Sequence, residues 1–378
     1  MIPYSHQSID GEDLRSVREV LESDWMTQGP KIKEFESALA DYCGAKYAVV
    51  ISNGTAALQA AYFAAGIGPG DEIITSPITF AATSNAAIWQ GATPVFVDVE
   101  RSTGNIDAHL IEEKITGKTK AIVAVDYSGL PCDLDILKSI AKKHNLILIE
   151  DAAHSLGAEY GGKKVGSIAD MTTFSFHPVK SITTGEGGAI LTDNENFYKK
   201  LLLFRSHGIT KDANDFKNDP HGPWYHEMQE LGLNYRMTDM QAALGISQLK
   251  KLPTFIKSRN ELAKRYSEEL SGFPDLVLPA DFEGRKSSRH LYPIRLSGKL
   301  QSRRREVFEK LQKAGVGVQV HYIPVYWHPY YQELGYKKGI CPVAEDFYLS
   351  EISIPIYPGL SGSDQETVIK EIKNILIS

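Results

Sequence analysis

The chain has few cysteines, and only Cys43, Cys132 and Cys341 occur among its 378 residues. An odd number of scattered cysteines argues against a disulfide framework, and the lack of a C-x-x-C pair gives no sign of zinc or redox chemistry. No segment approaches the roughly 18 apolar residues that a membrane-spanning helix needs. The start, Met1 to His6, has neither a basic stretch nor an apolar run, so no signal peptide is expected. These absences predict a soluble cytoplasmic protein.

An excess of positive charge is also missing, because 41 Lys and Arg residues face 47 Asp and Glu residues and the formal net charge is -6. This balance argues against a nucleic-acid-binding protein, although a local basic pocket for an anionic small molecule is compatible with it. The composition, 42% hydrophobic and 23% charged, is that of an ordinary globular protein. Because domains usually contain about 100–200 residues, the length favours two of them.

What is present is a regular alternation of apolar and helix-like segments after Gly44. Strands are expected at Tyr47–Ile51, Glu72–Thr75, Pro94–Val99, Ala121–Val125, Leu146–Glu150, Thr173–Phe176 and Ala189–Thr192. Helices are expected at Thr55–Ala65, Ala81–Gln90, Leu110–Ile115 and Leu134–His144. Strands that are apolar throughout and separated by helices indicate an α/β fold with a mainly parallel sheet flanked by helices.

The pattern changes after residue 210. A polar segment at 211–230 is either disordered or a functional lid, and Trp224 and Tyr225 within it favour a lid. A helix is expected from about Thr238 to Leu252, ended by Pro253. Strand, helix and strand are then expected at 290–296, 303–314 and 316–320. We therefore predict a large domain at 1–250 and a smaller α+β C-terminal domain at 251–378.

One lysine stands out by its surroundings. The sequence Phe174-Ser175-Phe176-His177-Pro178-Val179-Lys180 places it in a polar loop after a strand, and Gly185, Gly187 and Gly188 follow. Glycines permit close approach of the backbone to a bound molecule. Most single lysines are solvated surface charges, so this motif alone is only suggestive.

Two further motifs also follow apolar segments. Asp151 comes at the end of an expected buried strand, where open parallel sheets bind ligands, but a helix cap or a turn carboxylate is as consistent with that segment. His154 is equally consistent with a packing histidine. Gly54 and Thr55 begin a helix after a strand, and a helix N-terminus suits a phosphate, although an ordinary cap is the simpler interpretation.

Together, a strand-end aspartate, a Gly-Thr helix start and a loop lysine form the pattern of a pyridoxal-phosphate site. Lys180 would form the aldimine with the cofactor and then act as general base and acid. Asp151 would keep the pyridine nitrogen protonated, and the helix start with Ser175 would hold the phosphate.

The whole chain resembles the DegT/DnrJ/EryC1/StrS sugar aminotransferases, a fold-type I pyridoxal-phosphate family. The resemblance is carried by Ser-Asn-Gly-Thr-Ala-Ala-Leu from Ser52, Glu-Asp-Ala-Ala-His-Ser from Glu150, Ser-Phe-His-Pro-Val-Lys from Ser175, Gly-Glu-Gly-Gly from Gly185 and Asn-Tyr-Arg-Met from Asn234. It implies that Lys180 is the Schiff-base lysine, that the pyridoxamine form occurs in the half-reaction, that Phe80 stacks on the cofactor ring and that His154 lies near it. It also implies that Asn234 reaches the phosphate of a neighbouring subunit, hence a homodimer with shared active sites.

Within the family, the sequence is most similar to the branch that aminates the C4 ketone of a UDP-linked 4-keto-6-deoxy N-acetyl sugar for pseudaminic acid synthesis, with L-glutamate as amino donor. The similarity implies that the sugar nucleotide contacts Tyr4, Asp24, Trp25, Met26, Thr27, Gln319, Val320, His321 and Tyr322. Amination of another stereoisomer or at C3 stays open, as does a non-catalytic pyridoxal-phosphate-binding regulator. A dehydratase branch, in which histidine replaces the lysine, is disfavoured by Lys180.

Overall fold

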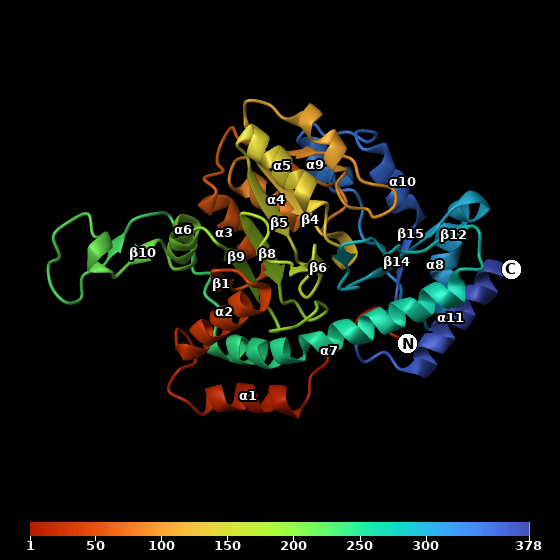
Figure 1. Ribbon diagram of the computed structural model, residues 1–378, viewed down its shortest axis with the longest axis horizontal. Helices are drawn as coiled ribbons and strands as arrows, with labels where there is room; N and C mark the ends of the chain where they lie inside the picture. Colours follow the sequence, from red (N-terminus) through yellow and green to blue (C-terminus); the bar gives the residue numbers. More distant parts are fainter. Residues whose placement is uncertain (378) are drawn as a thin grey trace.

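A computed structural model describes residues 1–377, and a seven-stranded sheet lies at its centre (Figure 1). The strand order is β1-β9-β8-β5-β4-β2-β3. The strands are β1 (Tyr47–Ile51), β2 (Glu72–Thr75), β3 (Thr93–Phe96), β4 (Thr119–Val125), β5 (Ile147–Asp151), β8 (Met171–Ser175) and β9 (Gly188–Thr192). Neighbours from β3 to β8 pair in parallel, whereas β9 pairs antiparallel with both β8 and β1. The expected mainly parallel sheet is confirmed.

Helices cover both faces of this sheet because its strands carry apolar side chains on both sides. The helices that pack on it are α2 (Pro30–Cys43), α3 (Gly54–Ala64), α4 (Ala82–Trp89), α5 (Leu134–His144), α6 (Glu195–Arg205) and α7 (Asp239–Leu270). Val49 of β1 packs with residues of α3, α4 and α6, and the next residue, Val50, packs with α2 and α7. Alternate strand side chains point to opposite faces, so both layers follow from the apolar strands.

Helix α7 corrects the expectation that Pro253 ends a helix. It starts at the expected Thr238 cap, where Thr238 and Gln241 form a reciprocal capping box, but it runs through Pro253 to Leu270. Proline removes one backbone hydrogen bond, and here the buried Leu252 and Phe255 on either side keep the helix packed. The helix therefore crosses residue 250, and the division at 1–250 and 251–378 stays a prediction.

A second, smaller sheet lies in the C-terminal part of the chain, in the order β12-β14-β15. Its elements are β12 (Leu276–Val277), β14 (Tyr292–Leu296), α8 (Arg304–Lys313), β15 (Glu351–Ile354) and α11 (Gly362–Ile377). Their apolar side chains form one cluster with the end of α7, including Leu262 and Tyr266. The strand expected at 316–320 is absent from residues 1–377 as a regular element, and single bridges join Val316 to Ile2 and Gln319 to Ser353. This stretch pairs with irregular neighbours, which apolarity alone does not reveal.

The remaining elements are short or peripheral. They are α1 (Gly11–Leu21), β6 (Glu159–Tyr160), β7 (Lys163–Lys164), β10 (Ile209–Thr210), β11 (Glu227–Met228), β13 (Arg285–Lys286), α9 (Pro329–Glu333) and α10 (Pro342–Ser350). The helix expected at Leu110–Ile115 is wrong, because two 3-10 turns, Ala108–Leu110 and Glu112–Lys114, occupy that stretch. Hydrogen bonds between residues three apart, from the Leu110 amide to Asp107 at 3.1 Å and from the Lys114 amide to Ile111 at 2.9 Å, form these tighter turns.

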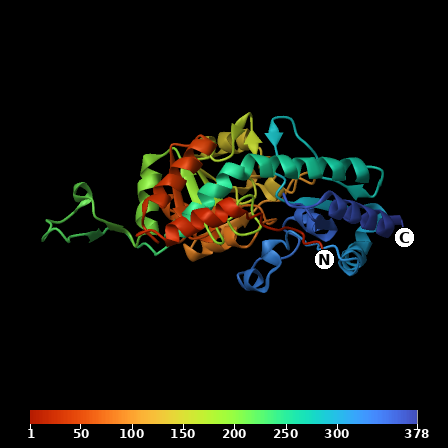
Figure 2. The ribbon, with the colours of Figure 1, turned by 90° about the horizontal axis from the view of Figure 1, so that it is seen from below.

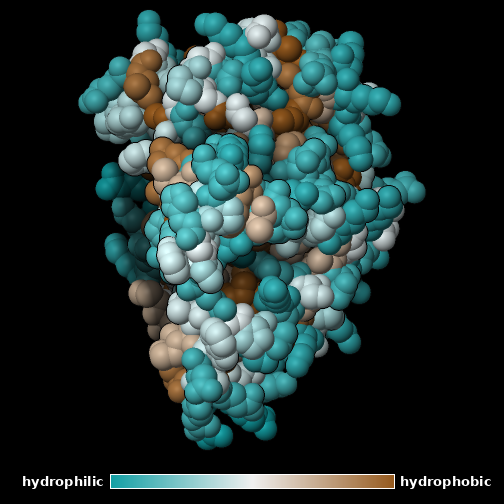
Figure 3. Space-filling model, turned by 90° about the vertical axis from the view of Figure 1, so that its left-hand side faces the viewer, coloured by the Kyte–Doolittle hydropathy of each residue, from teal (hydrophilic) through white to brown (hydrophobic). Residues whose placement is uncertain are grey.

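The polar segment after residue 210 forms an arm that projects from the body between β10 and β11 (Figures 1 and 2). The carboxylate of Glu227 organises it, accepting hydrogen bonds from the Lys217 and Asn218 amides at 2.7 and 2.8 Å and from the Tyr225 hydroxyl at 2.8 Å. The end of the molecule on the arm's side is mostly hydrophilic, with scattered hydrophobic patches (Figure 3). That the segment acts as a lid stays a prediction.

Across residues 1–377, no helix combines the length and apolarity needed to cross a membrane. Within the same range, no three or more His, Cys, Asp and Glu side chains gather as metal ligands would.

Candidate active site

Asp151 ends β5, near the centre of the seven-stranded sheet, where carboxyl ends of parallel strands meet. Its Oδ2 accepts a hydrogen bond from Thr83 Oγ1 at 2.7 Å, and its Oδ1 accepts one from the Ala153 amide at 3.3 Å. Burial raises the pKa of the Asp151 carboxyl, while these hydrogen bonds and the charge of Lys180 act in the opposite direction. The site therefore holds a buried carboxylate with a lysine in its field.

Lys180 lies in the loop after β8, where its amide donates to the carbonyl of His177 at 2.9 Å. Burial lowers the pKa of its amine to about 8, and the charge of Asp151 partly opposes this shift. A lysine with this pKa has a substantial neutral fraction near neutral pH, as a nucleophilic or basic amine needs.

The start of α3 lies against the end of β8. Asn53 caps the helix by accepting from the Ala56 amide at 2.8 Å, which leaves the Gly54 and Thr55 amides without an acceptor in the described chain. A Cβ at Gly54 would lie 2.8 Å from Cβ of Ser175, so glycine is what allows this close approach. Two free amides, a hydroxyl and a helix N-terminus together suit an anion such as phosphate. We call Gly54, Thr55, Asp151, Ser175 and Lys180 the sheet wall.

Two buried histidines lie within the electrostatic influence of the lysine. The Tyr322 hydroxyl is 3.1 Å from Nε2 of His154, and the rings of His154 and His290 are 4.4 Å apart. Burial, followed by the charge of Lys180, lowers the pKa of His154 well below its usual value. The Phe80 ring lies edge-on to Tyr322, at 6.3 Å, and is 64% exposed. An exposed aromatic face next to Tyr322 is available for stacking on a bound ring.

A second wall comes from residues 319–322, which we call the C-terminal wall. The His321 ring is 5.7 Å from the ring of Tyr4, which reaches this wall from the start of the chain. The Ser5 hydroxyl donates to the carbonyl of Val179 at 3.4 Å, next to Lys180. The N-terminal segment therefore brings Tyr4 between the C-terminal wall and the lysine loop. Gln319 is exposed and Val320 half-buried.

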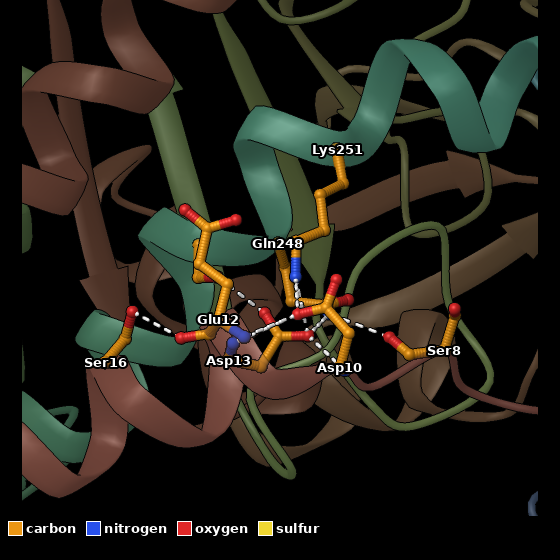
Figure 4. Close-up of polar contacts among 8 residues, drawn as sticks. Ser8, Asp10, Glu12, Asp13, Ser16, Gln248 and Lys251 are labelled. Carbon is orange, nitrogen blue, oxygen red and sulfur yellow. Dashed lines mark hydrogen bonds and ion pairs between the residues drawn. The ribbon is translucent and has the colours of Figure 1, made fainter.

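Asp13 anchors this N-terminal segment to α7 (Figure 4). Its carboxylate is buried and accepts from Ser247 Oγ at 2.6 Å and from Gln248 Nε2 at 2.8 Å, and it pairs with Lys251 at 2.9 Å. Gln248 also donates to the carbonyl of Ser8 at 2.9 Å. The far end is held where the Ile2 amide donates to Gly315. The segment is thus fixed on both sides of Tyr4.

The structure does not bring every expected residue to the lysine. Asp24, Trp25, Met26 and Thr27 are exposed near the starts of α2 and α7, where Thr27 forms a bridge with Thr238. Asn234 is exposed and bridges Ser206. Among the described contacts, none joins these residues to Lys180.

Sequence reasoning missed Thr83 and His290. Thr83 lies inside an expected helix, and its contact with Asp151 joins residues 68 positions apart, which no local spacing reveals. His290 is 136 positions from His154 in the sequence, and only the approach of the two rings shows that it belongs to the site.

Comparison with known proteins identifies the same family as the sequence motifs. The model of the DegT/DnrJ/EryC1/StrS aminotransferase family matches residues 7–373. A UDP-4-amino-4,6-dideoxy-N-acetyl-beta-L-altrosamine transaminase of Campylobacter jejuni is 42% identical over 381 residues, covering 100% of this chain and 98% of that protein. The Helicobacter pylori aminotransferase PseC, described as involved in pseudoaminic acid biosynthesis, superposes with a TM-score of 0.93 at 38% identity, covering 100% of this chain and 99% of that one.

A sugar aminotransferase of Streptococcus pneumoniae, solved in a pyridoxamine-phosphate form, superposes with a TM-score of 0.94 at 34% identity, covering 100% of this chain and 99% of that one. Aminotransferases of this family use pyridoxal phosphate, and the sheet wall fits that cofactor. The close approach at Gly54 and the free amides beside Ser175 suit its phosphate, and the buried Asp151 suits its pyridinium nitrogen. The expected enzyme class and cofactor are confirmed.

Proposed function

Since the chain belongs to the DegT/DnrJ/EryC1/StrS aminotransferase family, we propose that it aminates the C4 ketone of a UDP-linked 4-keto-6-deoxy N-acetyl hexose, with L-glutamate as amino donor, in pseudaminic acid-type biosynthesis. The observation that carries aminotransfer is the amine of Lys180, with its pKa lowered to about 8, in the field of the buried Asp151. The substrate is supported by the name of the Campylobacter jejuni relative, a UDP-sugar transaminase. A cytoplasmic location fits such a substrate.

The sheet wall holds the cofactor in this proposal. When bound, pyridoxal phosphate supplies an aldehyde that takes up the amino group and a protonated ring that withdraws electrons. The carboxylate of Asp151 keeps the ring nitrogen protonated. The amides of Gly54 and Thr55 and the hydroxyl of Ser175 bind the phosphate.

Phe80 and His154 complete the cofactor side. Phe80 offers its exposed ring for stacking, and His154, held neutral by burial, lies beside the cofactor ring without adding a positive charge. The Tyr322 hydroxyl fixes the orientation of His154 through the contact at Nε2.

Lys180 moves the proton in the reaction. Its amine, with a pKa of about 8, moves a proton between a carbon of the substrate and a carbon of the cofactor. It can do so because its neutral and charged forms are close in free energy near neutral pH. The lowered pKa comes from burial in the loop after β8. A solvated lysine would be charged at this pH and unable to accept the proton.

The sugar nucleotide lies against the C-terminal wall and Tyr4. The His321 ring of this wall lies 5.7 Å from the Tyr4 ring, and His321 Nε2 has no hydrogen-bond partner in residues 1–377. Polar groups left free beside the lysine can bind sugar hydroxyls. Asp24, Trp25, Met26 and Thr27, exposed near the start of α2, are proposed as further contacts with the nucleotide.

We propose a homodimer in which Asn234 binds the cofactor phosphate of the partner subunit. Asn234 is exposed, and so are the side chains of Leu231 (80% exposed) and Trp224 (76% exposed), which lie beside and in the projecting arm. This exposure supports contact with a second copy. The test mixes the inactive Lys180→Ala and Asn234→Ala variants after subunit exchange, with each variant exchanged against itself as control. Recovered activity in the mixture alone is expected, and none after verified exchange contradicts shared sites.

The substrate is tested with a panel of UDP-linked 4-keto and 3-keto sugars, glutamate and the cofactor-loaded protein, with NMR of each product. The expected product carries a new amino group at C4 of the 4-keto-6-deoxy N-acetyl hexose. Amination at C3, or only of another stereoisomer, contradicts the proposed substrate. If the protein retains its cofactor but turns over none of the sugars, the result favours a non-catalytic regulator that binds pyridoxal phosphate.

A further inference from the structure

Strand β15 presents two buried polar side chains to the C-terminal wall. Side chains alternate along a strand, so Glu351 and Ser353 share one face, while Ile352 and Ile354 pack into the C-terminal apolar cluster. Glu351 and Ser353 are both fully buried. Ser353 pairs through its backbone with Gln319, which aligns β15 with residues 319–321. Buried polar groups in this position need partners, since an unpartnered one has lost its hydrogen bonds to water without replacement.

Those partners form a chain that ends at the imidazole of His321. The Ser353 hydroxyl is 2.5 Å from Glu351 Oε1 and 2.8 Å from His321 Nδ1. Glu351 Oε2 accepts from the His321 backbone amide at 2.8 Å, which keeps the carboxyl in place. The other ring nitrogen, Nε2, is left for the substrate side, next to Tyr4 and Tyr322.

A serine hydroxyl has a single hydrogen. If Ser353 donates to one of its two partners, it must therefore accept from the other. If Glu351 is ionised, Ser353 donates to it and must accept from His321, which places the imidazole hydrogen on Nδ1. If Glu351 is protonated at Oε1, it donates to Ser353, and Ser353 then donates to His321 Nδ1. The imidazole hydrogen is then on Nε2, because Nδ1 serves as the acceptor.

We propose that the protonation state of Glu351, relayed through Ser353, determines whether His321 carries its hydrogen on Nε2, where it faces the sugar. Glu351 and Ser353 are then positioning residues that set the tautomer of His321. The inference rests on the proposed function only in placing the sugar at His321. Glu351 and Ser353 touch neither the lysine loop nor Asp151 in any described contact.

The proton transfer balances without a further reactant. The hydroxyl proton of Glu351 passes to Ser353 Oγ, the former Ser353 proton passes to His321 Nδ1, and His321 releases its Nε2 proton to the solvent or to a substrate oxygen. The result is an ionised Glu351 and a neutral His321 in its other tautomer. The reverse sequence returns a proton to Glu351, and His321 never carries a charge.

The surroundings favour this route over a charged imidazole. Burial, with a smaller contribution from the Lys180 charge, lowers the pKa of His321 to about 3. Burial raises the pKa of Glu351 to about 8, although Ser353, the His321 amide and the charge of Arg304 on α8 oppose the shift. Tyr4, Tyr127 and Tyr322 also face the pair, with pKa values raised by burial, and stay neutral. His154 and His290, which interact with His321, have pKa values lowered by burial and stay neutral as well.

The test uses ¹⁵N-histidine-labelled protein without substrate, and reads the His321 tautomer from its ring nitrogen shifts at pH 6.5 and 9.5. The His321 signals are assigned by their loss in His321→Gln. In the wild type, the hydrogen is expected on Nε2 at the lower pH and on Nδ1 at the higher pH. Glu351→Gln is expected to keep it on Nε2 at both values, because the glutamine oxygen accepts from the His321 backbone amide and the NH2 group then faces Ser353, to which it donates.

Two serine variants complete the design. Ser353→Ala breaks the chain, so the His321 tautomer should no longer change with pH. Ser350→Ala removes another buried hydroxyl, which bonds only to backbone carbonyls of α10, and should keep the wild-type behaviour. The same tautomer in the wild type and in Glu351→Gln at pH 9.5 would overturn the inference. Because the tautomer is read without substrate, that result would not count against the proposed aminotransfer. Failure of the protein to turn over a sugar nucleotide would likewise not change the tautomer result.

Discussion

The two walls of the site are built in different ways. Residues of the sheet wall lie at the ends of β1, β5 and β8 or just after them, and their positions come from strand ends that the sheet brings to one edge. The C-terminal wall is an irregular stretch, held by side chains of β15 and by the N-terminal segment. The sheet wall therefore depends on the fold as a whole, and the C-terminal wall depends on single hydrogen bonds. Substitutions should reduce the chemical step at the first wall and disturb positioning and stability around the second.

Within the sheet wall, Asp151→Asn is expected to have the largest effect short of removing Lys180. An amide cannot stabilise a protonated ring nitrogen as a carboxylate does, so kcat should fall about 10²–10³-fold, the size of losing one pre-organised electrostatic contact. Steady-state kinetics with saturating cofactor measures this. Glu113→Gln, an exposed carboxylate with no described partner, is the control. If both variants behave alike, Asp151 has no electrostatic role.

Asp13→Ala tests the anchor of the N-terminal segment. It leaves Ser247, Gln248 and Lys251 without their buried acceptor, so the free energy of unfolding should fall by about 3 kcal/mol. Urea unfolding measures the loss, with the exposed Glu12→Ala in the same helical turn as control. A loss equal to that of the control would show that the cluster in Figure 4 does not hold the segment.

The lowered pKa of Lys180 distinguishes its amine from that of a solvated lysine. The amine reacts only when neutral, so acetylation of Lys180 in the cofactor-free protein should rise with pH, reach half its maximum near the pKa of about 8, and then level off. A lysine model compound in the same solution, with a pKa of about 10.4, is the reference. Mass spectrometry of the modified peptide gives the rates. Coincidence of the two curves would contradict burial as the cause of activation.

The smallest effect is expected at the contact between the C-terminal wall and His154. Tyr322→Phe removes the hydroxyl that meets His154, and one hydrogen bond contributes about 1 kcal/mol to the free energy of unfolding. Tyr330→Phe is the matched control, because Tyr330 is exposed and its hydroxyl has no described hydrogen bond. A larger loss than this would mean that the C-terminal wall depends on the sheet wall more than the contacts indicate.

Much of the sheet wall could be predicted from the sequence, because apolar strands, glycines and a strand-end aspartate are local signals. The strands around Asp151 and Lys180 were expected within a few residues of their observed bounds. The contact of Thr83 with Asp151 and the pairing of Ser353 with Gln319 could not be, since both depend on packing between distant segments. Helix α7 passes Pro253 for the same reason, because burial outweighs a local helix-ending signal.

The most direct test of the account asks which lysine carries the cofactor. The cofactor-loaded protein is reduced with borohydride, digested and mapped by mass spectrometry, with Lys180→Ala treated in parallel. The account predicts the cofactor mass on the peptide that contains Lys180 and no labelled peptide in the variant. Label on another lysine, or none on the wild type, would contradict it.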